Sequence, residues 1–442
     1  MQIAALEERA VSPVGYHALD DRPGFKMDLQ VVDDTWYLYL SHFWHSGWSI
    51  VDVTDPANPT LENFISGPEN TTTKQVQVAD GTMVTSLERP RANGPIDGPI
   101  SDPSEPYATG AYIWDVETNP AEPELLGHYD TGGRGTHRNY YAGGDYAFMC
   151  ASPEGFEPTI EDESTKPVKN FFLTIVDVSN RENPVEVSRW MLPEQNPDER
   201  TDDVENFYLH GPAYVQGESA YLSYGRAGMV KIDVSDIESP ELVYRMDFGE
   251  GLGAYNGVHS FIPRPETDIA VVNSEAVLEG SPLEREGDPL QYTFLVDISD
   301  DSPPGFDGVH HHGPRVVSTV PMPTPEDSLP YDSYYEKHGR FGPHNQHHPR
   351  GEESRLQADD LLFMTYFNAG LRIFDISDPL VPQEVGYFVP EAPEKRISNS
   401  RPSSGLVAQF EDVVVDSRGY IYCTEPQRGV SIYESPLVDP EA

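Results

Sequence analysis

A short pattern of residues recurs along this chain and limits the possible folds more than any other feature of the sequence. Stretches of mostly β-branched apolar residues end at an Asp and continue into Ser, Asn, Asp and Pro, as in SIVDVTDPANP at 49–59 and TIVDVSNRENP at 174–184. The first Asp of each copy is Asp52, Asp115, Asp177, Asp233, Asp297 or Asp375. The apolar run favours a strand, and the polar residues favour a turn because their side chains bond nearby backbone groups.

Each repeat has room for four strands. Consecutive copies lie 63, 62, 56, 64 and 78 residues apart, as the Asp positions show. A tight turn such as Ala79-Asp80-Gly81 separates the first two strands, the motif forms the third, and a run such as LLGHYD at 125–130 forms the fourth. One such unit cannot bury both of its faces alone, so the repeats indicate the blades of a β-propeller. An array of β-sandwiches is the alternative.

The two ends of the chain complete each other. A degenerate seventh copy, VSIYE, ends at Glu434 and has three strands before the chain ends, whereas SPVGYHAL at 12–19 resembles the fourth strand VPQEVGYF at 381–388. We therefore expect residues 12–18 to form the outer strand of the last blade, which removes free sheet edges. The prediction is an all-β, seven-bladed propeller with four-stranded blades, formed as one domain by residues 1–442. The expected blades span approximately 26–65, 73–130, 136–192, 208–247, 257–320, 342–390 and 407–434.

The repeats resemble the LVIVD-repeat family, whose name describes the apolar-Val-Asp strand seen here as SIVDV, TIVDV and FLVDI. This resemblance covers essentially the whole chain and implies a propeller but little about chemistry. LRIFDISDPLVP at 371–382 is also similar to a strand of the selenium-binding protein (methanethiol oxidase) family. That second resemblance covers one blade and implies a copper-dependent oxidation of a small thiol.

The composition is strongly acidic, with 74 Asp and Glu against 29 Lys and Arg and a formal net charge of −45. The acids are spread along the chain, and only 7 of the basic residues are Lys. This balance is typical of a halophilic protein, whose carboxylates are screened and hydrated in high salt. A basic partner is the alternative, and nucleic-acid binding is excluded because it needs positive potential.

The N-terminus, MQIAALEERA, lacks the basic and apolar regions of a signal peptide, and no apolar run has the length of a membrane span. We expect a cytoplasmic protein with no membrane contact. The two cysteines, Cys150 and Cys423, form neither a disulfide framework nor a CxxC metal motif.

Alignment of the repeats places an imidazole at the start of four successive inner strands and a carboxylate in a fifth. These residues are His137, His210, His259, His344 and Glu411. Inner strands of a propeller face its narrow axial channel, so the groups should converge. Neutral imidazoles and a carboxylate ligate transition metals, and we expect one Fe, Cu or Zn ion there. Hydrogen-bonded channel histidines without a metal are the alternative, and whether His347 or His348 replaces His344 stays open.

Long loops should cover the same end of the channel and form a pocket. They include 87–110, 152–170 and 274–292 between second and third strands, and 193–208, 321–342 and 390–406 before inner strands. Within this region, Arg226 is placed to hold an anionic substrate or an oxyanion. We name Glu411, Arg226 and His45 as the candidate catalytic residues, whereas the run His310–His312 is a candidate only for adventitious metal.

Two functions remain open from the sequence. The first is a metalloenzyme, more specifically an oxidoreductase acting on a small molecule; a metal-dependent hydrolase or lactonase is less favoured. The second is a non-catalytic propeller that binds a protein or other ligand, with a structural metal or none. The sequence contains no nucleophile elbow, P-loop, Rossmann fingerprint or HExxH motif that would favour another chemistry.

Overall fold

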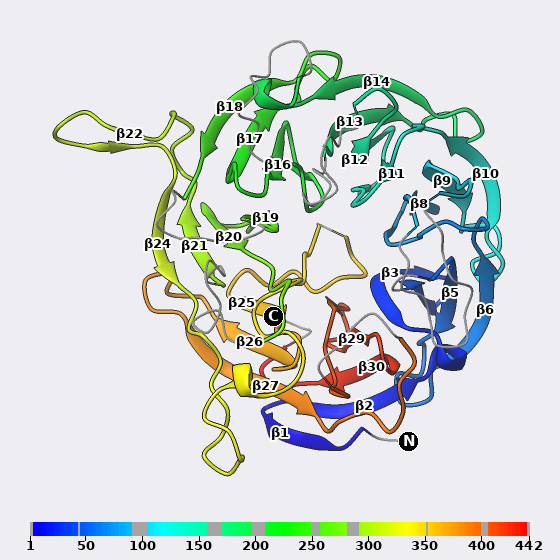
Figure 1. The fold of residues 1–442 in the computed structure, drawn as a ribbon, viewed down its shortest axis with the longest axis vertical. Coiled ribbons are helices and arrows are strands. Elements are labelled where there is room, and N and C mark those ends of the chain that lie inside the picture. The colour runs from blue at the N-terminus through cyan, green and yellow to red at the C-terminus, as the bar shows by residue number, and fades with distance from the viewer. Residues whose placement is uncertain are drawn as a thin grey trace.

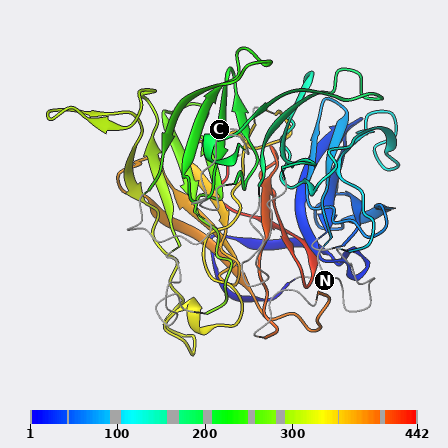
Figure 2. The same cartoon turned by 45° about the horizontal axis from the view of Figure 1, so that its top comes forward.

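Seven four-stranded antiparallel sheets surround a central axis, as Figure 1 shows for this computed structural model. The structure describes residues 3–42, 45–90, 104–156, 170–196, 208–248, 257–280, 291–350, 352–398 and 405–439. The fold is therefore the predicted all-β seven-bladed propeller. The turned view in Figure 2 shows the hairpin of β22 (Gly305–Phe306) and β23 (His311–His312) projecting from the ring.

The strands are given from the axis outward. Blade 1 contains β3 (Gly24–Val32), β4 (Thr35–His42), β5 (Gly47–Asp52) and β6 (Thr60–Ser66). Blade 2 contains β7 (Val76–Ala79), β8 (Thr82–Leu87), β9 (Gly110–Asp115) and β10 (Glu124–Tyr129). Blade 3 contains β11 (Gly135–Thr136), β12 (Tyr146–Ser152), β13 (Phe172–Asp177) and β14 (Val185–Trp190). Blade 4 contains β15 (Tyr214–Gln216), β16 (Ser219–Ser223), β17 (Met229–Asp233) and β18 (Glu241–Met246). Blade 5 contains β19 (Ser260–Pro263), β20 (Ile269–Asn273), β21 (Thr293–Asp297) and β24 (Arg315–Thr319).

The last two blades take their outermost strands from the N-terminal region. Blade 6 contains β25 (Leu361–Thr365), β26 (Leu371–Asp375), β27 (Gln383–Pro390) and β1 (Ala5–Arg9), and blade 7 contains β28 (Asp412–Val415), β29 (Ile421–Glu425), β30 (Gly429–Glu434) and β2 (Ser12–His17). The pairing of β2 with β30 confirms the predicted closure of the last blade. The pairing of β1 with β27 was not predicted.

The inner edge of blade 6 is an irregular segment rather than a regular strand. His344 N donates to Thr365 O at 2.9 Å, and His347 N donates to Phe363 O at 3.0 Å. Gln346 forms an isolated bridge with Met364. The segment therefore follows β25 and takes the place of an inner strand.

The repeated Asp closes each motif by a side-chain hydrogen bond. Its Oδ1 accepts the N–H of the residue two positions on, at 2.8 to 3.0 Å in all six copies. This is the local turn chemistry that the sequence pattern predicts. Each third strand consequently ends at the repeated Asp, and the chain then turns back to form the next strand outward.

Buried apolar side chains fill every interface between neighbouring blades. Seven clusters are present among the described residues, and each joins one pair of neighbours. One of them packs Leu29 and Leu38 of blade 1 against Tyr422 and Ile432 of blade 7. The core is thus a closed ring, and the last blade packs on the first through an apolar cluster like those between the other blades.

The described residues contain little helix. The helical elements there are short 3-10 turns, η1 (Leu19–Asp21), η2 (Pro193–Gln195) and η5 (Tyr334–Glu336). No helix in this part of the chain has the length and apolar character needed to cross a membrane.

Candidate functional site

One backbone hydrogen bond places five channel residues at the same level. The N–H of each residue donates to a carbonyl near the end of the second strand in its own blade, at 2.8 to 2.9 Å. The donors are His137, His210, His259, His344 and Glu411, and their acceptors are Cys150, Ser223, Asn273, Thr365 and Thr424. The register that the repeat alignment predicts is therefore present in blades 3 to 7.

The four imidazoles form a continuous arc around the channel. Ring centroids are 5.8 Å apart for His137 and His210, 4.6 Å for His210 and His259, and 5.0 Å for His259 and His344. All four side chains are buried. The structure thus brings together the histidines that the sequence selects.

Glu275 lies among three of these histidines. It follows β20, and one of its carboxylate oxygens is 3.4 Å from Nε2 of His210 and 3.9 Å from Nε2 of His259. The other oxygen is 3.7 Å from Nε2 of His344. The Glu275 side chain is 12% exposed, so the cluster keeps a contact with solvent. The sequence analysis did not assign Glu275 to the metal-ligand set.

The outer nitrogens of two imidazoles contact polar groups behind them. Nδ1 of His259 is 2.8 Å from the Ser260 hydroxyl, and Nδ1 of His344 is 3.3 Å from Oε2 of Glu411. Both Nε2 atoms lie within 4 Å of Glu275, although Nε2 of His344 is also 3.4 Å from Nδ2 of Asn345. Burial, together with neighbouring His259 and the nearby Arg and Lys cations, lowers the pKa of His344 well below its usual value, so this ring is neutral.

Two guanidinium groups border the cluster. Arg340 lies 2.5 Å from Glu411 and 3.4 Å from Glu275, and its guanidinium stacks 3.7 Å from the centre of the Phe367 ring. Arg138 is 3.4 Å from Nε2 of His259. Each arginine is buried. Buried cations at these positions neutralise the carboxylates and offer donors to an anion.

His137 has a different set of partners from the other three histidines. Its Nδ1 lies 2.7 Å from Oε2 of Glu88, and the same oxygen is 2.9 Å from the Lys74 ammonium group. Glu88 and Glu275 both follow second strands, of blades 2 and 5. His137 therefore joins the arc through its ring contact with His210 while its Nδ1 is engaged by a buried ion pair.

The remaining predicted site residues lie outside this cluster. Arg226 is exposed in the turn between β16 and β17. His45 packs against His42 and Phe64 of blade 1, with ring centroids 5.8 and 5.7 Å away. Of the three candidate catalytic residues, only Glu411 contacts the histidine arc through a contact identified among the described residues.

The histidines of blade 6 are separated by their surroundings. His344 lies in the arc, whereas Nε2 of His347 contacts the Leu356 carbonyl at 2.9 Å and its Nδ1 accepts from the Val415 N–H at 3.1 Å. His348 packs against Tyr214 further along the channel, with ring centroids 4.8 Å apart. Much of the three long loops between second and third strands lies outside the described residues, so the predicted loop cover is not described.

Sequence reasoning missed Glu275 as the centre of the cluster, although its place after a second strand was a usable signal. It also missed Arg138 and Arg340. Arg138 directly follows an aligned histidine and was open to the same alignment. Arg340 lies in an irregular connection before His344, where no strand period places a side chain.

The closed ring and its hub define a β-propeller with a channel lined by histidine and glutamate. The chain contains LVIVD repeats: the sequence model of this repeat matches residues 25–64, 168–191 and 360–389, in blades 1, 3 and 6. No curated protein matches the chain significantly.

Solved propellers of distant sequence share the fold. The RRP9 WD40-repeat structure is 8% identical, with coverage of 98% of this chain and 99% of that one and a TM-score of 0.54. The U3-55K structure is 7% identical, covers 96% and 98%, and has a TM-score of 0.54. The Cps50 (Swd1) propeller domain from Myceliophteria thermophila is 7% identical, covers 93% and 99%, and has a TM-score of 0.50. At these identities the likeness concerns the fold alone.

Proposed function

We propose that the hub of this propeller binds one transition-metal ion through His210, His259 and Glu275, with His344 as a fourth ligand. The observation that carries the proposal is the convergence of three imidazole Nε2 atoms on one carboxylate. Donor atoms of His210, His259 and Glu275 all lie within 4.8 Å of one another. Two imidazoles and one carboxylate are the donor set of many zinc and non-haem iron sites. Among Fe, Cu and Zn, this set favours Fe and Zn.

The surroundings of two proposed ligands, His259 and His344, support the assignment. A ligating histidine usually gives its second nitrogen to a carboxylate or hydroxyl, which fixes the ring and its tautomer. His259 has Ser260 in that place, and His344 has Glu411. The lowered pKa of His344 keeps its lone pair free of a proton, as metal binding requires.

A catalytic role for the ion is the function that we favour. Three or four protein ligands leave positions open for water or substrate, and Glu275 keeps the cluster in contact with solvent. Arg138 and Arg340 are placed to hold a small anionic substrate beside the ion. The ion would then act as a redox centre or a Lewis acid, and we favour oxidation of a small molecule.

A non-catalytic scaffold is the second candidate, and one observation favours it. Arg340 already contacts both Glu275 and Glu411, so these two carboxylates have a cationic partner within the protein. A buried network that is balanced in this way holds the hub together without an ion. In this case the ring would serve to present a binding surface.

Elemental analysis of tag-free protein tests the metal site. The background carries His310→Ala, His311→Ala and His312→Ala, which removes the exposed histidine run on the β22–β23 hairpin. We expect about one Fe or Zn per chain, reduced at least about tenfold in His259→Ala and in Glu275→Gln. His128→Ala, on the exposed side of β10, is the matched control and should keep its metal. Full occupancy in both hub variants would refute the ligand assignment.

A second measurement separates catalysis from scaffolding. Cobalt(II) in the hub gives an absorption spectrum that changes when an external ligand such as azide enters an open position. A spectral change on azide addition supports a catalytic ion, whereas an unchanged spectrum supports a closed structural site.

A further inference from the structure

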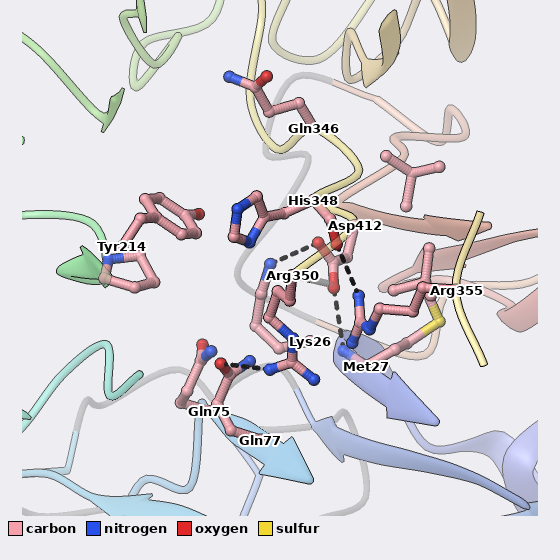
Figure 3. A pocket seen from close by; sticks show the side chains of 13 residues that line it. Lys26, Met27, Gln75, Gln77, Tyr214, Gln346, His348, Arg350, Arg355 and Asp412 are labelled. Atoms are coloured by element: carbon pink, nitrogen blue, oxygen red, sulfur yellow. Dashed lines mark hydrogen bonds and ion pairs between the residues drawn. The ribbon is translucent and has the colours of Figure 1, made fainter. Parts of the chain in front are cut away.

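A pocket lies further along the same inner segments that carry the histidine arc. It has a volume of about 380 Å³, including the part open to solvent. Figure 3 shows side chains from several blades around this space. Tyr214 and His348 come four residues after His210 and His344, and both line the pocket.

Several polar atoms facing this pocket are unpaired. Among the described residues, neither the oxygen nor the nitrogen of the Gln75 amide has a hydrogen-bond partner, and Nδ1 of His348 has none. Gln75 is fully buried. Burial of an amide without partners costs about 1–3 kcal/mol, so such atoms call for a partner from outside the chain, either water or a ligand. The neighbouring Gln346 differs because its amide contacts Arg264 and Asn273.

The charges around the pocket favour an anion that also carries a hydroxyl group. Lys26 is paired with Asp412, and a lysine ammonium retains donors beyond one such bond. Arg350 and Arg355 also line the pocket, although their guanidinium groups form ion pairs with Asp28. Asp412 is the one acidic residue of the lining, and its Oδ2 already accepts from Met27 N. The lining is therefore rich in donors, with Gln75 Oε1 and Asp412 as acceptors.

We propose that this pocket is a binding site for a small hydroxycarboxylate. The carboxylate of the ligand accepts from Lys26 and from the Gln75 NH₂ group. The hydroxyl contacts Nδ1 of His348 or the Gln75 oxygen. The proposal is independent of the metal, because none of the three proposed contacts is a group of the histidine–glutamate cluster.

Calorimetric titration of chelator-treated protein with L-lactate and D-lactate tests the site. Propionate has the same carbon skeleton without the hydroxyl, and glycerol has hydroxyls without the charge. We expect one lactate per chain, propionate bound at least about tenfold more weakly and glycerol not bound. Metal-free protein is used so that failure here leaves the metal proposal untouched.

The decisive variant is Gln75→Leu, which is nearly equal in volume and leaves the backbone bond to Ser86 in place. It should weaken lactate binding at least about tenfold, and His348→Phe should do the same. The control Gln216→Leu, at the exposed end of β15, should bind lactate normally. Absence of lactate binding in the parent protein would overturn the proposal. Equal affinity in parent and Gln75→Leu, or propionate binding as tight as lactate, would overturn it as well.

Discussion

His344 and Glu411 meet across the interface between blades 6 and 7, where Nδ1 of the histidine lies 3.3 Å from a carboxylate oxygen. Both side chains are almost completely buried. The contact orients the ring so that its Nε2 faces Glu275 on blade 5. Three blades thereby determine the position of one imidazole nitrogen.

We predict that Glu411→Gln weakens metal binding by about 10- to 100-fold, because the change removes the charge that orients His344. Competition with a chromophoric chelator measures the affinity, and circular dichroism checks that the fold is retained. Glu425→Gln, a buried acid at the end of β29, serves as the control. Unchanged affinity in Glu411→Gln would exclude Glu411 as a positioning residue.

Glu425 should make stability depend on pH. Burial raises the pKa of this carboxyl from 4.5 to about 7, against the opposing effect of Arg428. The folded state then binds more protons than the unfolded state between pH 4.5 and 7, so its contribution to stability is lost as the pH rises through this window. Glu425→Gln should match the parent near pH 4.5 and exceed it at pH 8 by about 1–3 kcal/mol.

Urea unfolding of the parent and of Glu425→Gln at a series of pH values measures this effect. The difference between the two proteins isolates the residue from the rest of the acidic surface. A difference that stays constant between pH 4.5 and 8 would contradict the prediction.

Salt should stabilise the protein strongly. Three of the seven lysines, Lys26, Lys74 and Lys231, have side chains only 11%, 3% and 10% exposed, so they do little to balance the acidic surface. We expect the Tm to rise by more than about 10 °C between 0.1 M and 2 M KCl. The same titration at pH 4, where many carboxylates are protonated, is the control and should show a smaller rise. A Tm independent of salt would count against a halophilic protein.

Removal of the N-terminal strands should act in two stages. Deletion of residues 1–10 removes β1 from blade 6 and with it buried Glu7, which bonds the Tyr334 hydroxyl. Deletion of residues 1–18 also exposes β30 as a free edge, which favours association. Because the first deletion also exposes the edge of β27, we expect a lower Tm and some oligomers in both, with more oligomers in the second. Thermal unfolding measures the change in Tm, and size-exclusion chromatography measures association. If the protein lacking residues 1–18 is monomeric, the exposed edge of β30 does not cause association.

The fold was predictable because its determinants are local and repeated. Asp52 and Asp375 make the same side-chain turn, and the mismatch between a three-stranded end and the orphan strand at 12–18 identifies the closure. The histidine arc followed from the same register. Arg340 did not, because it reaches the hub from an irregular connection whose path depends on packing among several blades. Glu275 lies just after β20, but its contacts with three histidines depend on how blades 4 to 6 pack together. The β1 strand was not predicted because the repeat pattern accounts for blade 6 without an additional strand from the N-terminal region.

The pairing of β2 with β30 determines when the ring can close during synthesis of the chain. Ser12 pairs with Glu434, so β2 is synthesised long before the strand with which it pairs. Blades can fold one by one as they emerge, but the ring stays open until β30 has emerged. The histidine–glutamate cluster, formed by blades 4 to 6 and contacted by Glu411 of blade 7, thus takes its final shape only after blade 7 has folded.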